Sequence, residues 1–298
     1  MEHKRTTGII LILAAAMLWG TTGTAQTFAP LGLSSYWVGT GRLVVAGIFF
    51  LILLTVRDIN CLRWSRLQPL PWAAIAWGAA GMAVYNLAFF AGVRATGVAV
   101  GTAVALGSGP LWAGLLQALI TRQKPRGIWW VAVSIAVVGL VLTTFNPDED
   151  ASLSVTGLIL CLLSGLSYAC YALATKHIVA HSTPAVGTAT VFTLAALLAL
   201  PFAFLLAGQP QLHVADLGVM VWLGVVATGV AYLLFSSGLR HVSSATGVAL
   251  ALAEPVTAVA LAILIVGERP GMTGLLGVGL ILGGLALLIR SELLTVRN

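Results

Sequence analysis

A segment bounded by two prolines occurs twice in the chain, and the two copies lie 145 positions apart. Residues 110–125 read PLWAGLLQALITRQKP, and residues 255–270 read PVTAVALAILIVGERP. Other positions repeat in nearly the same register: Gly8 with Gly157 and Trp19 with Tyr168 at an offset of 149, and Gly92 with Gly238 at an offset of 146. Two related halves in an apolar chain are typical of a transporter built from repeats. A duplication inside a membrane protein without transport activity would leave the same pattern.

The composition identifies the solvent of this chain as a lipid bilayer. Charged residues make up 8% of the 298 residues, apolar residues make up 59%, and the mean hydropathy is +1.02. A soluble domain of this length does not need so much apolar surface. The net charge of +6 is explained by Lys and Arg held on one side of a membrane, so no nucleic-acid partner is expected. Three cysteines without metal-ligand spacing indicate neither a disulfide framework nor a metal site.

Segments long and apolar enough to cross a bilayer as helices need about 20 residues each. The sequence contains ten of them: 7–28, 34–56, 70–93, 98–121, 127–145, 153–177, 184–206, 215–239, 244–265 and 271–290. The first follows a short basic stretch and could be mistaken for a secretory signal. Because the same run recurs at 156–176, where no signal can lie, we interpret the first segment as the first helix of a repeat.

The distribution of Lys and Arg predicts how the spans are oriented. If the N-terminus is cytoplasmic, 12 Lys and Arg residues fall on the cytoplasmic side and 2 fall outside, with Arg42 inside a span. Short cytoplasmic loops carry the excess of positive charge in membrane proteins. We therefore expect a multi-pass protein of the plasma membrane, the inner membrane in bacteria, with both termini in the cytoplasm.

Five spans in each half require the second half to enter the membrane upside down. We place the first repeat at residues 1–147 and the second at residues 148–298. The predicted fold is all-α: two inverted five-helix repeats, ten transmembrane helices in total, around a central cavity. In such proteins the ligand site lies between the repeats near the midplane, and rocking the halves exposes it to each side in turn.

Several short motifs, in their order along the chain, resemble those of a known family. They are Trp19-Gly20, Arg42, Pro110, Glu254-Pro255 and Glu268-Arg269. With these, the chain resembles the drug/metabolite transporter superfamily, in particular its ten-helix EamA-type members, and among them it is most similar to bacterial amino-acid exporters. The resemblance implies a basket-like bundle with a central cavity, no ATP site, no ATPase subunit and outward movement of small metabolites. The second half departs from this pattern, because it has Tyr168-Ala169 for Trp-Gly and lacks a counterpart of Arg42.

Two ionisable residues lie deep inside predicted spans, where a charge is costly and often functional. Arg42 could attract a substrate carboxylate, because a guanidinium offers a planar pair of donors. It could also bond backbone carbonyls or extend toward the outer surface. Glu254 could carry a proton or bind a substrate amine. Alternatively, it could bond the backbone donors that are freed beside Pro255.

Polar and aromatic residues on shared helix faces make up the predicted substrate site. Trp19, Thr22 and Gln26 recur at spacings of three and four, so they share one face. The remaining predicted site residues are Arg42, Tyr85, Asn86, Ser108, Trp112, Tyr168, Tyr232 and Glu254. Phe89 forms a stripe with Tyr85 and Asn86, and Tyr171 and Thr175 lie within two turns of Tyr168. A few polar groups in an apolar setting are typical of small-molecule sites, and helix packing is the alternative for each residue.

The sequence also contains three predicted hinge residues, namely Gly109, Pro110 and Pro255. A proline removes a backbone hydrogen bond from a helix, so the helix can bend at that point. A moving half-helix needs such a joint, although a static kink is the alternative.

The sequence as a whole favours a carrier that exports amino acids or related small metabolites by alternating access, with the lipid bilayer as its surroundings. A Walker phosphate-binding motif and a nucleophile paired with a base are both absent from the sequence, so neither ATP-driven pumping, nor catalysis, nor a cofactor is expected. An intramembrane enzyme would need paired catalytic groups in the spans, and a channel would need a continuous polar pore. Drugs or organic cations, and sugars or nucleotide sugars, are the alternative substrates. With one deep carboxylate, facilitated efflux is the simpler expectation, and coupling to a gradient stays open.

The predicted orientation can be tested at the loop that joins the halves. In a variant without native cysteines, Asp148→Cys should react with a membrane-impermeant maleimide added to intact cells, because residues 146–152 are expected outside. Labelling that requires broken membranes would contradict the inverted arrangement.

Overall fold

The computed structural model describes residues 2–28, 33–57, 70–144, 154–211 and 213–294. Within them lie ten helical segments long and apolar enough to cross a membrane, and the predicted all-helical class is confirmed. The first half contains α1 (Glu2–Thr27), α2 (Ser35–Arg57), α3 (Trp72–Thr96), α4 (Val98–Leu116) with the π-helix η2 (Gln117–Thr121), and α5 (Gly127–Thr144). The second half begins with α6 (Val155–His181) and α7 (Pro184–Ala207). The predicted boundary between the repeats, at 147 and 148, lies outside the described residues.

The third and fourth spans of the second half are less regular than their counterparts in the first. One span consists of α8 (Val214–Val221), the π-helix η3 (Trp222–Val230) and α9 (Ala231–Leu239). The next consists of α10 (Ser244–Leu250), the 3-10 turn η4 (Ala251–Ala253), α11 (Glu254–Leu261) and the π-helix η5 (Ala262–Val266), and α12 (Met272–Leu294) completes the bundle. Changes of helix type within a span often mark functional positions.

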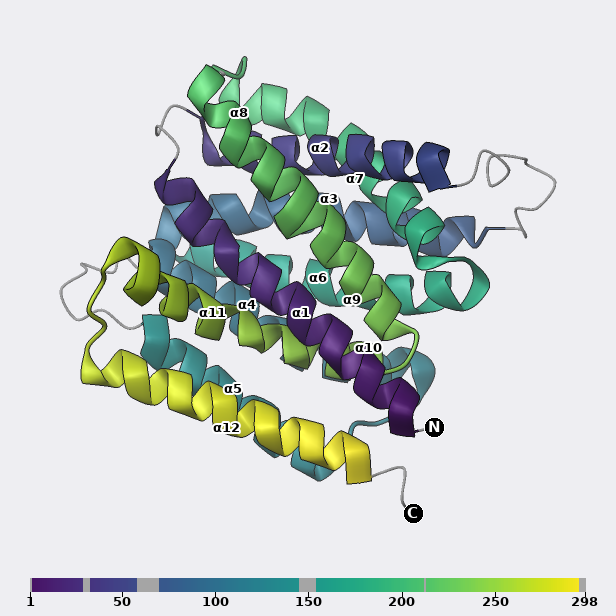
Figure 1. The fold of residues 1–298 in the computed structure, drawn as a ribbon, viewed down its shortest axis with the longest axis vertical. Helices are drawn as coiled ribbons and strands as arrows, with labels where there is room; N and C mark the ends of the chain where they lie inside the picture. Colours follow the sequence, from purple (N-terminus) through teal and green to yellow (C-terminus); the bar gives the residue numbers. More distant parts are fainter. Residues whose placement is uncertain (1, 29–32, 58–69, 145–153, 212, 295–298) are drawn as a thin grey trace.

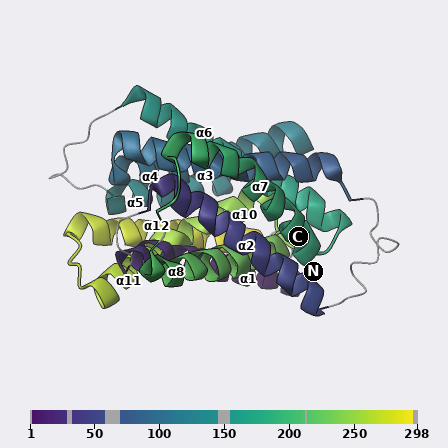
Figure 2. The ribbon, with the colours of Figure 1, turned by 90° about the horizontal axis from the view of Figure 1, so that it is seen from above.

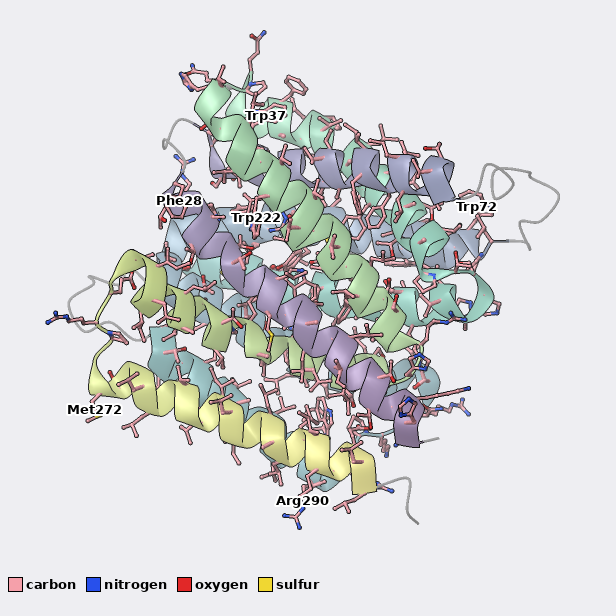
Figure 3. All side chains as sticks on the ribbon, viewed as in Figure 1. Phe28, Trp37, Trp72, Trp222, Met272 and Arg290 are labelled. Carbon is pink, nitrogen blue, oxygen red and sulfur yellow. The ribbon has the colours of Figure 1, made fainter. Side chains whose placement is uncertain are left out.

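The helices α6 and α12 each run four residues beyond the predicted spans, to His181 and Leu294. A helix satisfies its own backbone hydrogen bonds, so it can continue past the hydrocarbon into the headgroup region. The lateral surface is apolar: Phe28, Trp72 and Met272 project outward in Figure 3 and are 68%, 59% and 74% exposed. Side chains of this kind face lipid.

The two halves interlock instead of lying side by side. The first helix of each half leaves its own half: α1 packs along α9 and α11, and α6 packs along α3 and α4. The helix α2 packs along α7, and α5 packs along α12, a pair that Figure 1 shows at the lower edge of the bundle. Each of these pairings is reproduced when the two halves are exchanged, as an inverted repeat requires.

Glycine contacts repeat in the same register. A Cβ added at Gly238 would meet the Gly8 carbonyl oxygen at 2.8 Å, and one added at Gly92 would meet the Gly157 carbonyl oxygen at 3.1 Å. These are the positions that the offsets of 146 and 149 relate. Close approach through small residues is the usual way in which helices associate in membranes.

The duplicated proline-bounded segment forms the same structure twice. The π-helices η2 and η5 occupy positions 145 apart, and each is followed by a left-handed residue, Arg122 with φ 57° and Gly267 with φ 82°. A left-handed residue commonly ends a helix, and glycine adopts it without strain. The repeat in the sequence is therefore a repeat in backbone conformation.

The start of α1 and the end of α12 lie at the same end of the bundle (Figures 1 and 2). We call this the termini end, and the opposite end, where α1 finishes and α3 meets α4, the far end.

The glycine contacts predict a selective effect of larger side chains. Gly238→Leu should lower the melting temperature of the purified protein in detergent, because overpacking α1 against α9 costs about 1–3 kcal/mol. Gly279→Leu is the matched control, since a Cβ at Gly279 meets nothing within 4 Å. Equal melting temperatures for the two variants would show that the contact between α1 and α9 does not hold the halves together.

Candidate functional site

A largely enclosed cavity of about 120 Å³ lies between the two halves. Nine of the predicted site residues line it: Trp19, Thr22, Gln26, Arg42, Tyr85, Asn86, Tyr168, Tyr232 and Glu254. They come from six spans of both repeats, and two predicted hinge residues, Gly109 and Pro255, join them in the wall. The wall also contains Phe89, which shares the predicted stripe of Tyr85 and Asn86. The remaining lining residues were left out by sequence reasoning: Phe90, Thr102, Ala105, Leu106, Val248, Ala251 and Leu252.

Two predicted site residues, Ser108 and Trp112, lie outside the cavity lining. On α4 the residues that face the cavity are Thr102, Ala105, Leu106 and Gly109. Ser108 lies on the neighbouring face, where its Oγ donates to the Ala105 carbonyl at 3.3 Å, and the Trp112 ring packs against the hydrophobic core. Spacing alone does not separate Trp112 from the lining residues, because Trp112 stands three residues after Gly109 and seven after Ala105.

Arg42 is held by one edge of its guanidinium group. Its Nε donates to Thr228 Oγ1 at 3.1 Å, and Thr228 Oγ1 donates in turn to the Leu223 carbonyl at 2.7 Å, five residues earlier in η3. Thr228 is fully buried. Among the described residues, no hydrogen bond or ion pair engages the two terminal nitrogens of Arg42. The fork of the guanidinium is therefore oriented but left available in the cavity.

Glu254 lies where its helix is broken. It is the first residue of α11, directly after the 3-10 turn η4 and before Pro255. Within the described part of the chain, no hydrogen bond engages its carboxylate, so the interpretation in which it bonds freed backbone donors finds no support there. Arg42 lines the same cavity, yet no ion pair joins the two side chains among the described residues. The cavity thus presents a guanidinium group and a carboxyl group that form no ion pair with each other among the described residues.

The predicted hinges differ between the repeats. The helix α4 continues through Pro110, which is buried inside it. At the equivalent position in the second half, Pro255 follows the 3-10 turn, and the span is interrupted beside the cavity. The two repeat-related prolines therefore differ in their surroundings: Pro110 lies in a continuous helix, and Pro255 lies where the helix is broken.

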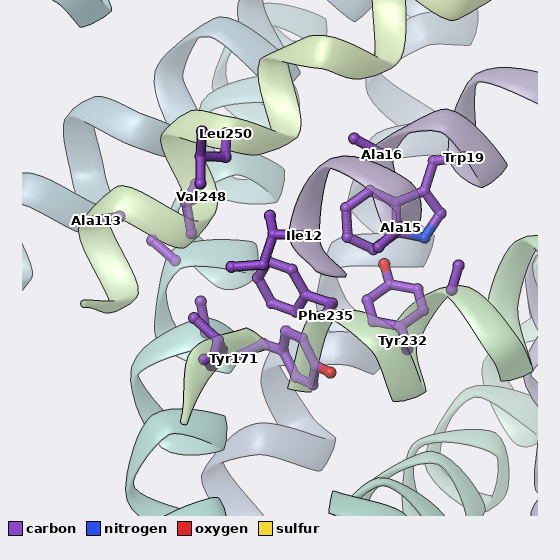
Figure 4. Close-up of a cluster of buried hydrophobic side chains, with 14 of the residues drawn as sticks. Ile12, Ala15, Ala16, Trp19, Ala113, Tyr171, Tyr232, Phe235, Val248 and Leu250 are labelled. Carbon is purple, nitrogen blue, oxygen red and sulfur yellow. The ribbon is translucent and has the colours of Figure 1, made fainter. Parts of the chain in front are cut away.

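Aromatic rings close the cavity on the side of the termini. The Trp19 ring centroid lies 4.9 Å from that of Tyr232 and 5.4 Å from that of Phe235. Behind them, Tyr171 and Phe235 are fully buried, and the cluster is drawn in Figure 4. On α1 the lining runs from Trp19 toward Gln26, so the cavity extends from the middle of the bundle toward the far end.

Polar contacts close the termini end outside this aromatic layer. Lys176 Nζ donates to the Leu239 carbonyl at 2.6 Å and to the Val242 carbonyl at 2.8 Å, and so ties α6 to the turn between α9 and α10. In that turn, burial lowers the pKa of His241, with Arg240, Lys176 and Lys4 acting in the same direction. His241 is therefore neutral at pH 7 and adds no charge beside the lysine.

A second set of polar contacts joins the ends of three other helices. Gln117 Oε1 accepts from Ser244 Oγ at 3.1 Å and from the Ala245 backbone N–H at 3.0 Å. Thr246 Oγ1 donates to Glu292 Oε1 at 2.6 Å. The repeat provides no copy of the Gln117 contact at the far end, because Ala262 stands 145 positions later.

A bundle of ten apolar helices with a cavity between two interlocked halves defines a membrane transporter of the inverted-repeat class. The chain belongs to the EamA-like transporter family, which it matches twice, over residues 6–145 and 155–290. It is 34% identical to the uncharacterized transporter YwfM of Bacillus subtilis over 277 residues, which cover 93% of this chain and 91% of that protein. An uncharacterized transporter of Archaeoglobus fulgidus is 30% identical over 212 residues, 68% of this chain and 73% of that protein. A solved crystal structure has the same fold, with a TM-score of 0.81 at 18% identity, covering 95% of this chain and 96% of that one.

The aromatic lining can be tested by truncation. Trp19→Ala, Tyr85→Ala and Tyr168→Ala should each lower transport in proteoliposomes without loss of folded protein, because removing one large contact costs about 1–3 kcal/mol of ligand affinity. Trp72→Ala, at an outward-facing position, is the control and should transport normally. Full transport by all three cavity variants would assign these rings to packing alone.

Proposed function

We propose that this protein exports amino acids and related small metabolites from the cytoplasm, across the plasma or bacterial inner membrane, by alternating access. The observation that carries the proposal is the pair Arg42 and Glu254, which line one cavity without pairing with each other. A free amino acid carries a carboxylate and an ammonium group. The guanidinium fork suits the carboxylate, and the Glu254 carboxylate suits the ammonium.

The size of the cavity supports a small substrate. Its volume of about 120 Å³ is well below the roughly 300–1,000 Å³ of sites for drug-sized ligands. A nucleotide sugar would require a much larger space. An organic cation is the second candidate, because aromatic rings and a carboxylate attract cations. Arg42 in the same small cavity disfavours it by charge repulsion.

The direction of opening supports alternating access. The termini end is closed by aromatic rings and by the contacts of Lys176 and Gln117, while the cavity extends toward the far end. With the termini in the cytoplasm, as the distribution of Lys and Arg predicts, a cavity that extends toward the far end fits a state that faces outward. An exporter releases its substrate from this state.

The substrate class can be tested with three related compounds. Proteoliposomes loaded with labelled leucine should release it, and leucine should compete far better than 3-methylbutylamine, which lacks the carboxylate, or 4-methylpentanoate, which lacks the ammonium group. A panel of sugars and organic cations is run beside them. Equal competition by the amine would favour the organic-cation carrier, and release of sugars without release of leucine would refute the proposal.

The Arg42 anchor predicts which variants lose the preference for a carboxylate. Thr228→Val removes the hydroxyl that holds Nε, so the affinity for leucine should fall more than the affinity for the amine. Thr228→Ser keeps the hydroxyl and should retain both. The measurement is the ratio of the inhibition constants for the two compounds in each variant. An unchanged ratio in Thr228→Val would show that Arg42 does not bind the carboxylate.

Glu254 is proposed to bind the ammonium group in a facilitative cycle. Glu254→Gln should weaken leucine binding, and an imposed pH gradient should leave the initial rate of leucine efflux from wild-type proteoliposomes unchanged. A wild-type rate that follows the pH gradient, together with a Glu254→Gln variant that exchanges leucine without it, would make Glu254 a proton carrier instead.

A further inference from the structure

The buried face of α6 carries hydroxyl groups that do not line the cavity. Tyr168, Tyr171 and Thr175 recur at spacings of three and four, so they follow one face from the cavity toward the termini end. Tyr171 is 1% exposed and Thr175 is 4% exposed. Their hydroxyls are neighbours, but neither makes a hydrogen bond of regular geometry with any described residue. A buried polar group without a partner is destabilising and calls for an explanation.

The repeat relates Tyr171 and Thr175 to residues in the wall of this cavity. Positions 149 earlier, in α1, are Thr22 for Tyr171 and Gln26 for Thr175. Both Thr22 and Gln26 line the cavity. The cavity is therefore lined by one copy of this face, while the other copy is buried.

A second pair of helices shows the same relation independently. Phe89 and Phe90 of α3 line the cavity. The residues 146 positions later, in α9, are Phe235 and Ser236, and both are 0% exposed. The lining residues Thr22, Gln26, Phe89 and Phe90 thus all have buried counterparts on the side of the termini.

In an inverted repeat, the opposite-facing state can be reached when the two halves exchange conformations, so that each residue takes the environment of its counterpart. We propose that Tyr171 and Thr175, together with Phe235 and Ser236, line the substrate site in the opposite-facing state, in which this site opens at the termini end. This site would offer a phenol and a hydroxyl where the present cavity offers a hydroxyl and an amide. It would take the same small substrate as it enters, an inference that rests on the alternating access proposed above.

Exchange of the halves gives these two buried, neighbouring hydroxyls a role. In the opposite-facing state the Tyr171 and Thr175 hydroxyls would contact water or substrate, and Thr22 and Gln26 would be buried in their place. Opening would also separate Gln117 from Ser244 and Ala245. Removing the Gln117 contact should therefore favour the opposite-facing state.

The test uses single cysteines in a background without Cys61, Cys161 and Cys170. Alkylation by a small, water-soluble maleimide is measured on purified protein in proteoliposomes made permeable to the reagent. Thr22→Cys should react and Thr175→Cys should be protected. In the Gln117→Ala background, the rate should rise several-fold at Thr175→Cys and fall at Thr22→Cys. The same opposite changes should appear during leucine exchange, because turnover visits both states.

Thr40→Cys is the matched control. Thr40 is buried at 1% exposure, and its hydroxyl also lacks a hydrogen bond within the described chain. The run Val38-Gly39-Thr40 recurs as Val186-Gly187-Thr188, 148 positions later, and Thr188 is buried too, so exchange of the halves leaves Thr40 protected. Reactivity of Thr40→Cys that rises together with Thr175→Cys would indicate general loosening and would overturn the proposal.

The outcomes separate this inference from the proposed substrate. Opposite changes in the alkylation rates of Thr22→Cys and Thr175→Cys in the Gln117→Ala background support the proposed opposite-facing state even if leucine is not transported. Protection of Thr175→Cys in every condition, including active exchange of whichever substrate the panel identifies, would overturn it. A further variant, Thr175→Val, removes the hydroxyl and keeps the shape. It should slow exchange without lowering the melting temperature, and unchanged exchange would contradict the proposal.

Discussion

The structure depends on the packing of α1 and α6 into the opposite halves of the molecule. Each of these helices contacts the third and fourth spans of the other repeat more closely than those of its own. Glycines at repeated positions permit this approach, because a side chain at Gly238 or Gly92 would meet backbone atoms of the partner helix. The same two helices supply Trp19 and Tyr168 to the cavity. The contacts that join the halves are therefore also the walls of the site.

The two halves are alike in fold and unlike in the contacts that close their ends. Lys176 and Gln117 seal the termini end through backbone acceptors and donors. Their counterparts in the repeat, Thr27 and Ala262, cannot form the same bonds. This asymmetry accounts for a cavity that extends toward the far end. In the proposed alternating access, a few side chains rather than the shared fold would then set the relative stability of the two facing states.

Most of the fold was predictable because hydropathy and the internal repeat act over the whole chain. The spans follow from the need to satisfy every backbone group inside lipid. Arg42 and Glu254 could be chosen as site residues because ionisable residues are rare in apolar spans. The orientation and the substrate stay predictions.

Other features could not be read from the sequence. Thr228 is an unremarkable threonine in an apolar span, and its role as the Arg42 anchor arises from the π-helical geometry of η3 and from a partner 186 residues away. Ser108 and Trp112 flank Pro110 and were assigned to the site for that reason, whereas in the structure the Ser108 hydroxyl bonds its own helix and the Trp112 ring packs against the hydrophobic core.

Exchange of conformation between the halves is the central claim, and distances between spin labels at repeat-related positions test it most directly. Phe28 and Arg94 lie at the far end, and their counterparts at offsets of 149 and 146, His177 and Arg240, lie at the termini end. All four are exposed, so labels can be attached without disturbing the core. The account predicts that adding substrate shortens the Phe28–Arg94 distance in a fraction of molecules and lengthens the His177–Arg240 distance in the same fraction. Distances that stay fixed, or that change in the same direction at both ends, would contradict it.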